Sequence, residues 1–260
     1  MIGAPIHPNA GNAAEYRRRL EALIDEMHRS LAYWLCARWR DNPPVTAADE
    51  LPAAAMRRTM KTLSRRWESR FDEAAPRLGE WFARRAADRA TSKLEEILDQ
   101  AGVTVRFRNT AAVRDVLAAT VGENVSLIRS IASEHLSDVE GLVMRSVAAG
   151  RDLSSLSREL EARYKATRRR AALIARDQNN KATATVARVR QQEAGVTKAR
   201  WLHSGGGKHP RPEHVAFAAG RLGGPFYDPA RGAYLEGRWT WPGTEINCRC
   251  VSRPVIEGFG

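Results

Sequence analysis

The stretch "YKATRRRAALIARDQNNKATATVARVRQQ", residues 164–192, combines the apolar pattern of a long helix with many basic residues. Its apolar residues recur at steps of three and four, which places them along one face of a helix. This apolar seam consists of Ala171, Ile174, Ala175, Ala182, Val186 and Val189. The pattern predicts a helix that begins near Thr167, follows a separate helix over residues 153–164, and ends before Gly195.

Helical patterns also dominate the residues before this stretch. A helix is predicted over residues 13–40, and "DNPP" at residues 41–44 should end it. Its apolar stripe is Tyr16, Leu20, Leu23, Met27, Leu31 and Trp34. A second helical region is predicted from about residue 51 to residue 100, with Pro76 as a kink or break and Gly102 as its end. Its large apolar anchors are Trp67, Phe71, Trp81 and Phe82. Helical periodicity returns over residues 113–149.

Two segments alternate apolar and polar residues and are predicted to be strands. The first is "VTVRF" at residues 103–107, and the second is "VTKARWLHS", which would place Ala199, Trp201 and His203 on one face. "RPEHVAFAAG" is typical of a short helix, and residues 220–247 are dense in Gly, Pro, Tyr and Trp. After Gly195 the sequence therefore changes from long helical patterns to short elements and loops.

These patterns predict a mainly α protein, with an elongated helical N-terminal part followed by a small, loop-rich α+β C-terminal module. We expect three regions along the chain. Residues 1–120 form a helical region that docks on a partner, residues 121–195 form a helical part with the basic segment, and residues 196–260 form the small module.

Positive charge is concentrated in one segment. The chain has a formal net charge of +12, and residues 163–200 hold eleven basic residues against Asp177 and Glu193. Such a balance favours an anionic partner such as nucleic acid, although a solvated helix face has the same composition. The residues expected to contact phosphates, without reading base edges, are Lys165, Arg168, Arg169, Arg170, Lys181, Arg188 and Arg190.

Cys248 and Cys250 lie one residue apart near the end of the chain. In an extended segment both sulfurs face the same side, and His214 lies upstream in the same module, so the three are candidate ligands of a structural zinc ion. His203 and His209 are alternative imidazole ligands. The other interpretation needs no cofactor, because two buried thiols can simply pack at the end of the module. A Cys-x2-Cys pair, the usual zinc-finger spacing, is absent from the sequence.

The composition narrows the class of protein. Three cysteines do not form a secreted disulfide framework, and the first residues lack the apolar core of a signal peptide, so we expect a reducing cytosol. The chain has no apolar run of about 18 residues, so no membrane-spanning helix is expected. Neither a nucleophile elbow nor a pair of acidic metal ligands accompanies the cysteines, so we expect no catalysis.

The order of the motifs resembles the Mu F-like phage head morphogenesis proteins, also called minor head or minor capsid proteins. The resemblance covers roughly residues 120–256 and rests on a helix "GRDLSSL" at 150–156, a helix "AALIARDQ" at 171–178 and a strand "WLHS" at 201–204. The turn "RPEH" at 211–214, the element "PGTEINCRC" at 242–250 and Pro254 complete the pattern.

The resemblance implies a structural protein of a tailed phage or prophage, located in the virion interior near the portal and in the host cytoplasm during assembly. It implies association with the portal protein and with packaged double-stranded DNA, and major capsid or scaffold proteins are further candidate partners. Family members often carry an acidic residue shortly before the R-P-x-H arginine. Here that loop reads "GGGKHPR", so a role of that acid does not transfer to this chain.

Two other functions remain open at this level. One is an enzyme, a metal-dependent nuclease or a transferase, that uses the histidines beside the basic segment. The other is a free-standing DNA-binding protein whose affinity falls steeply with salt. The first 120 residues do not resemble a named family, which suits a region that adapts to one partner.

Overall fold

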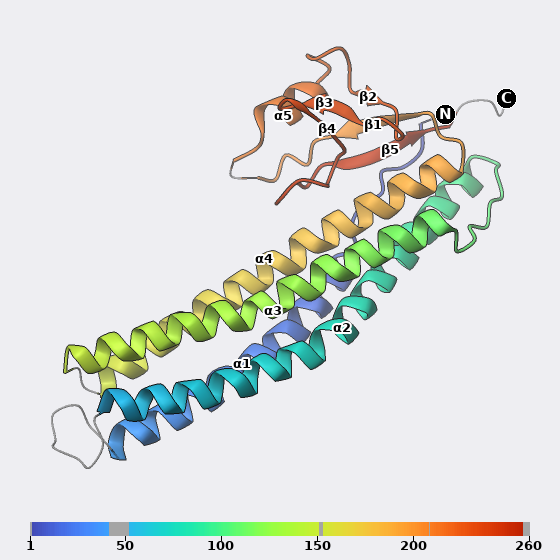
Figure 1. Cartoon of the computed structure of the whole chain (residues 1–260). Coiled ribbons are helices and arrows are strands. Elements are labelled where there is room, and N and C mark those ends of the chain that lie inside the picture. Colours follow the sequence, from blue (N-terminus) through green and yellow to red (C-terminus); the bar gives the residue numbers. More distant parts are fainter. Residues whose placement is uncertain (1, 42–51, 151–152, 208, 257–260) are drawn as a thin grey trace. The chain divides into compact units, whose positions relative to one another are not determined.

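The structure is a computed structural model that describes residues 2–41, 52–150, 153–207 and 209–256. Four long helices come first: α1 (Ala10–Asp41), α2 (Pro52–Gln100), α3 (Ala111–Ala148) and α4 (Leu153–Glu193). The module that follows contains β1 (Lys198–Leu202), α5 (Pro212–Ala218), β2 (Phe226–Tyr227), β3 (Ala233–Leu235), β4 (Arg238–Thr240) and β5 (Val251–Val255) (Figure 1). The mainly α class with a small α+β C-terminal module is confirmed. Most of the expected "DNPP" break lies outside the described residues.

The chain divides into two compact units, and each combines segments that are distant in sequence. Unit 1 contains Met1–Ala14, Glu80–Gly122 and Ala175–Gly260. Unit 2 contains Glu15–Gly79 and Glu123–Ile174. Unit 2 therefore consists of parts of all four long helices, and unit 1 combines the strands and α5 with other helical segments.

Unit 2 has the apolar core of a four-helix arrangement. Fully buried side chains from each helix form this core, because the apolar residues of each helix recur on one face. They include Tyr16, Leu20, Ile24, Met27, Leu31 and Leu35 from α1, Met60 and Phe71 from α2, Ile128 and Val139 from α3, and Leu156 and Ala171 from α4. The stripe predicted for the first helix is thus largely correct.

Three local predictions in the helices need correction, the last of them only in part. Trp34 is 49% exposed, and the stripe continues through Leu35 instead, because either residue fits a step of three or four from Leu31. The helix α4 runs through Thr167 without a break, since the Thr167 hydroxyl donates to the carbonyl of Arg163 within the same helix. Pro76 lies inside α2 and does not end it, so the predicted break is wrong, whereas the alternative of a kink stays a prediction.

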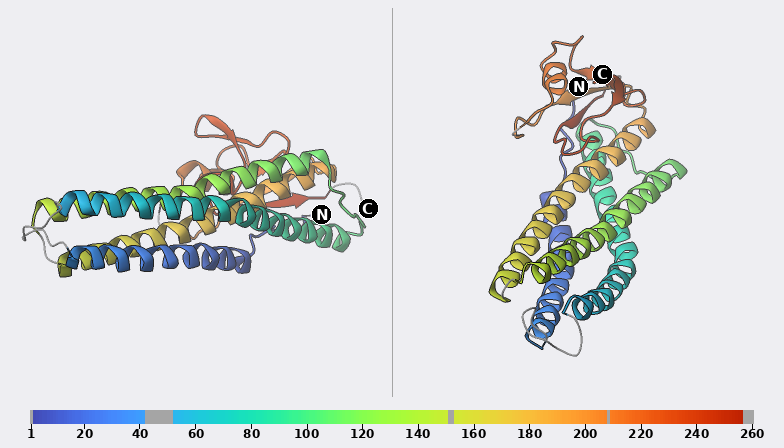
Figure 2. Two further views of the ribbon diagram at one scale, coloured as in Figure 1. Left: turned by 60° about the horizontal axis from the view of Figure 1, so that its bottom comes forward. Right: turned by 60° about the vertical axis from the view of Figure 1, so that its left-hand side comes forward.

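Unit 1 contains a three-stranded antiparallel sheet in the order β2–β1–β5 and a β3–β4 hairpin. In the sheet Ala199 pairs with Tyr227 on one side and with Pro254 on the other. Figure 2 shows the strands and α5 gathered into one group. The expected strand at "VTKARWLHS" and the helix at "RPEHVAFAAG" are confirmed as β1 and α5.

"VTVRF" is not a strand, which corrects the prediction. Its alternation is real, because Val103, Val105 and Phe107 pack against the cluster around Leu94 and Ile97. A strand also needs a paired neighbour, and this segment has none among the described residues. The segment follows Gly102, whose φ of 82° and amide bond to the Asp99 carbonyl end α2 as expected.

The seam predicted for residues 164–192 is confirmed in full: each of its six residues is buried. Gly195, with a φ of 71°, ends α4. In the part of the chain that the structure describes, every helix is too short or too polar to cross a bilayer.

Candidate metal centre and basic segment

His214 is placed by the short helix α5. Pro212 begins this helix, where a missing amide hydrogen costs nothing, and Arg211 before it is extended, as a residue preceding proline prefers. Burial of His214 and Phe217 on one side of α5 directs both rings to Trp201 of β1. The imidazole lies edge-on to the indole, with ring centroids 4.9 Å apart.

The two cysteines are placed by a tight loop that precedes β5. Gly243, with a φ of 87°, and Asn247, with a φ of 58°, supply the left-handed conformations that the loop requires. The Cys248 amide donates to the Glu245 carbonyl, and the chain then runs through Cys250 into β5. Both thiols are buried.

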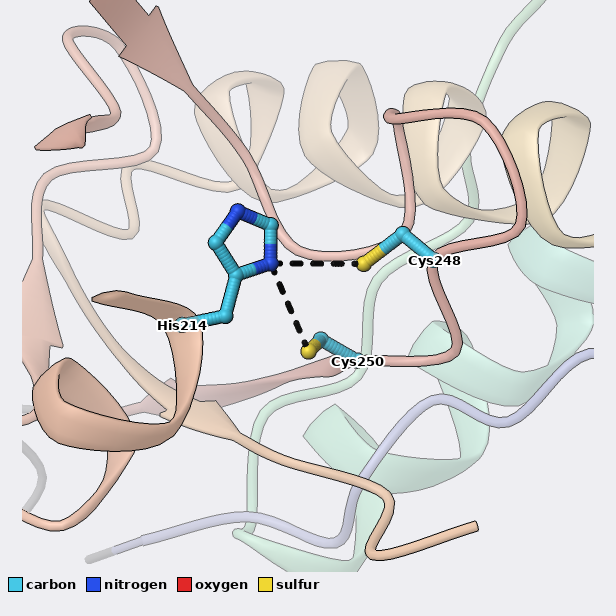
Figure 3. Close-up of side chains that lie close together, drawn as sticks. All are labelled: His214, Cys248 and Cys250. Carbon is cyan, nitrogen blue, oxygen red and sulfur yellow. Dashed lines mark hydrogen bonds between the residues drawn. The ribbon is translucent and has the colours of Figure 1, made fainter. Parts of the chain in front are cut away.

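His214, Cys248 and Cys250 converge on one point (Figure 3). The His214 Nδ1 atom lies 3.7 Å from Cys248 Sγ and 3.9 Å from Cys250 Sγ. The possible ligand atoms of the three residues all lie within 4.8 Å of one another. The predicted trio is therefore brought together, although the residues are up to 36 positions apart.

The pKa values of the two thiols are shifted in opposite directions. The bond from the Cys250 thiol, and after it the bond from His214, lower the pKa of the Cys248 thiol although burial acts in the opposite direction. The same bond to Cys248 and burial raise the pKa of Cys250. Cys248 is therefore the thiol of the pair that ionises more readily, and the thiolate is the form that binds metal.

The geometry fits a tetrahedral ion such as zinc. Ordinary Zn–S and Zn–N bonds imply ligand-to-ligand separations of roughly 3.6–3.8 Å, close to the two Nδ1–Sγ distances. Among the described residues three ligands are available, so a tetrahedral ion would keep a fourth position for another ligand. The His214 Nε2 atom is buried without a hydrogen-bond partner, whereas metal-bound histidines usually donate from that second nitrogen.

The alternative histidines lie elsewhere. The Nδ1 atom of His203 accepts from the Gly205 amide, and His209 is exposed. Neither belongs to the group of possible metal ligands found in the described residues.

Residues of α4 hold the cysteine loop, and sequence reasoning did not assign them this role. The Asn180 side chain donates to the Cys248 carbonyl at 3.0 Å, and Asp177 accepts from the Asn247 amide at 2.5 Å. Gln178 and Asn179 are also buried on the same stretch of helix. The signal was present as a run of polar residues, "DQNN", within an apolar seam.

Gly243 is required where the loop meets α4. A Cβ atom at this position would lie 2.9 Å from the Ala184 side chain and 3.0 Å from the Cys250 carbonyl oxygen. Only glycine allows both this approach and the left-handed φ. The P-G-x-x-I-N-C-R-C element therefore fits against α4 through its backbone.

Two of the arginines predicted to bind nucleic acid are engaged inside unit 2. Arg168 donates to Glu21 at 2.8 Å and to Asp25 at 3.3 Å. Arg170 lies 2.8 Å from Glu134. Their positive charges are largely balanced by these carboxylates.

Three other predicted residues differ in their exposure and in whether a carboxylate lies near them. Arg169 is exposed. Lys165 is exposed but lies 3.3 Å from Glu161, and Lys181 lies 3.2 Å from Asp177.

The sequence predicted that Arg188 and Arg190 contact phosphates from the outside of α4. The structure instead places both against other parts of the chain. The Arg188 guanidinium lies over the Trp241 ring, 4.3 Å from its centroid, and burial lowers its pKa. Arg190 is 5% exposed, lies 2.7 Å from Glu193 and covers the Phe107 ring. Because helical periodicity alone does not tell which polar residues a neighbouring segment covers, their placement required the tertiary structure.

Comparisons with known proteins agree with the motif order. An uncharacterized protein of Haemophilus influenzae is 27% identical over 208 residues, which are 79% of this chain and 44% of that protein. The chain thus spans less than half the length of this relative. No solved structure matches the chain. Residues 137–253, which contain all of α4, most of the sheet and the His214–Cys248–Cys250 trio, match the model of phage Mu protein F like proteins, and this part of the chain is therefore similar to that family.

Proposed function

We propose that the chain is a non-enzymatic minor head protein of a tailed phage or prophage, which associates with the portal vertex during head assembly and DNA packaging or exit. The observation that carries the proposal is the match of residues 137–253 to the phage Mu protein F like family. The net charge of +12 supports a location beside DNA, because a polyanion attracts a basic protein.

The composition of phage particles tests this function. Particles produced by the strain that carries the gene are purified, and their proteins are identified by mass spectrometry. We expect the chain in the particles and, when heads are dissociated gently, in a complex with the portal protein. Absence from particles, or turnover of a nucleic acid or nucleotide by the purified chain, would contradict the proposal.

We also propose that His214, Cys248 and Cys250 hold a structural zinc ion that closes the module. The distances, the burial of all three residues and the lowered pKa of the Cys248 thiol support it. When bound, the ion would crosslink α5 to the loop before β5 and so stabilise unit 1.

Elemental analysis of the purified full chain tests the zinc. We expect zinc in equimolar amount, its loss in Cys248→Ser, and its retention in Cys36→Ser, because Cys36 lies in unit 2 and outside the trio. A folded wild-type chain without metal, even after dialysis against zinc, would show that the thiols are packed without an ion.

A further inference from the structure

One face of the three-stranded sheet is basic. Phe226, Arg200 and Arg253 lie in register across β2, β1 and β5, because Arg200 is paired with both of the others. Lys198 lies two residues before Arg200 and therefore on the same face. The three strands contain no acidic residue.

The opposite face of the sheet is the buried one. Ala199 and Trp201 are fully buried, and Tyr227 donates to Ser252, which in turn donates to Gln191 of α4. Since side chains alternate along a strand, the cations point away from this packed face. Lys198 is exposed, and Phe226 is 40% exposed.

The positive charges on this face are not neutralised by carboxylates of the described residues. No carboxylate among the described residues forms an ion pair with Lys198, Arg200 or Arg253. Lys198 lies over the Phe226 ring at 4.9 Å, and Arg253 donates to the Gly3 carbonyl. The Nε atom of Arg200 is buried without a partner.

Three acidic residues of the described part of the module have partners elsewhere. Glu213 accepts from the amide of Glu236, and Glu245 lies 2.8 Å from Arg238. Asp228 accepts from the Ala230 amide in the turn before β3. These carboxylates therefore do not offset the sheet cations.

Two like charges directly opposite each other destabilise an antiparallel pair, so Arg200 and Arg253 are unfavourable for the free protein. An anion that spans both strands removes this repulsion and forms charge-assisted hydrogen bonds with the guanidinium groups. We propose that this face, formed by Lys198, Arg200, Arg253 and Phe226, binds the phosphate backbone of duplex DNA. The choice of DNA as the polyanion rests on the proposed function, and the surface rests on the register and charge of the sheet.

Binding of a fluorescent random-sequence duplex to the purified full chain tests the surface. The variant Lys198→Gln/Arg200→Gln removes two cations, and Lys165→Gln/Arg169→Gln on α4 removes two exposed cations elsewhere. We expect the sheet variant to bind at least about tenfold more weakly at low salt, with a log–log salt slope smaller by about 2. The α4 variant should keep most of the affinity and slope.

The stability of the sheet variant separates binding from folding. Because Arg200→Gln removes the repulsion with Arg253, the melting temperature should equal or exceed that of the wild type. A merely structural role of Arg200 predicts a lower melting temperature instead.

Three results would overturn the proposal: no binding of duplex DNA by the wild type, loss of binding in the α4 variant alone, or binding only to vesicles that contain phosphatidylglycerol. These results concern only the DNA-binding surface. The presence of the chain in purified particles, measured by mass spectrometry, tests the proposed function independently.

Discussion

The two units use buried polar groups in different ways. In unit 2 such groups are few and lie within an apolar helical core, for example the Tyr16 hydroxyl, which donates to Asn124 at 2.9 Å. In unit 1 the buried side chain of Asn180 and the partly exposed side chain of Asp177 bond to the backbone of a distant loop. Unit 2 therefore depends mainly on apolar burial, which many sequences supply, whereas unit 1 depends on particular donors and acceptors.

The largest expected effect is the loss of an aromatic side chain from the core of unit 2. Phe71 is fully buried, so Phe71→Ala should reduce the free energy of unfolding by about 4 kcal/mol. Hydrogen exchange should show the loss in unit 2. The matched control is Trp34→Ala, which removes an aromatic residue that is 49% exposed and should cost less than about 1 kcal/mol. Equal effects of the two variants would contradict the assigned core.

The next effect depends on pH and again concerns unit 2. His135 is 2% exposed, its Nδ1 atom lies 2.7 Å from the Thr167 hydroxyl, and its Nε2 atom has no partner. Burial, and after it the nearby His28, lower the pKa of His135 from 6.5 to about 4. The unfolded chain thus binds a proton more readily, so stability is complete above about pH 6.5 and is lost as the pH falls toward 4.

The loss attributable to His135 should be about 3 kcal/mol between pH 7 and pH 4. Denaturant unfolding of the wild type and of His135→Gln measures it, because the glutamine keeps a polar group but does not titrate. The pH dependence of the variant should be shallower by that amount. Parallel pH profiles would show that His135 is solvated in the native state.

The same contrast explains what sequence could predict. The seam of α4 was predicted residue by residue because burial on a helix follows a fixed period, and β1 was found by its alternation. The proximity of Cys248 and Cys250 was visible because the residues are close in sequence. The contacts of Asp177 and Asn180 span 70 and 68 residues, and no local period encodes them.

The next smaller loss of stability is expected from removing a polar contact in unit 1. Asn180→Ala leaves the buried Cys248 carbonyl without its donor and should cost about 1–2 kcal/mol. Asn180→Asp keeps the shape but lacks the donor, so it should cost at least as much. The loss should appear as faster hydrogen exchange at residues 244–251, and zinc affinity should fall with it. Unchanged exchange in this loop would mean that the contact does not hold the cysteines.

The smallest expected effect on stability comes from the arginines of α4. It tests whether an arginine that is already paired with carboxylates still contributes to DNA binding. Arg168 is a partly exposed group that already pairs with Glu21 and Asp25, so Arg168→Gln should cost only about 0.5–1 kcal/mol. Its charge is balanced within unit 2, whereas the charge of Arg200 has no partner in the described sheet. Arg168→Gln should therefore leave the salt slope of DNA binding unchanged. A slope smaller by about 1 would show instead that DNA displaces these carboxylates, and the positive charge counted in the sequence would then predict the binding surface better than the pairing in the structure does.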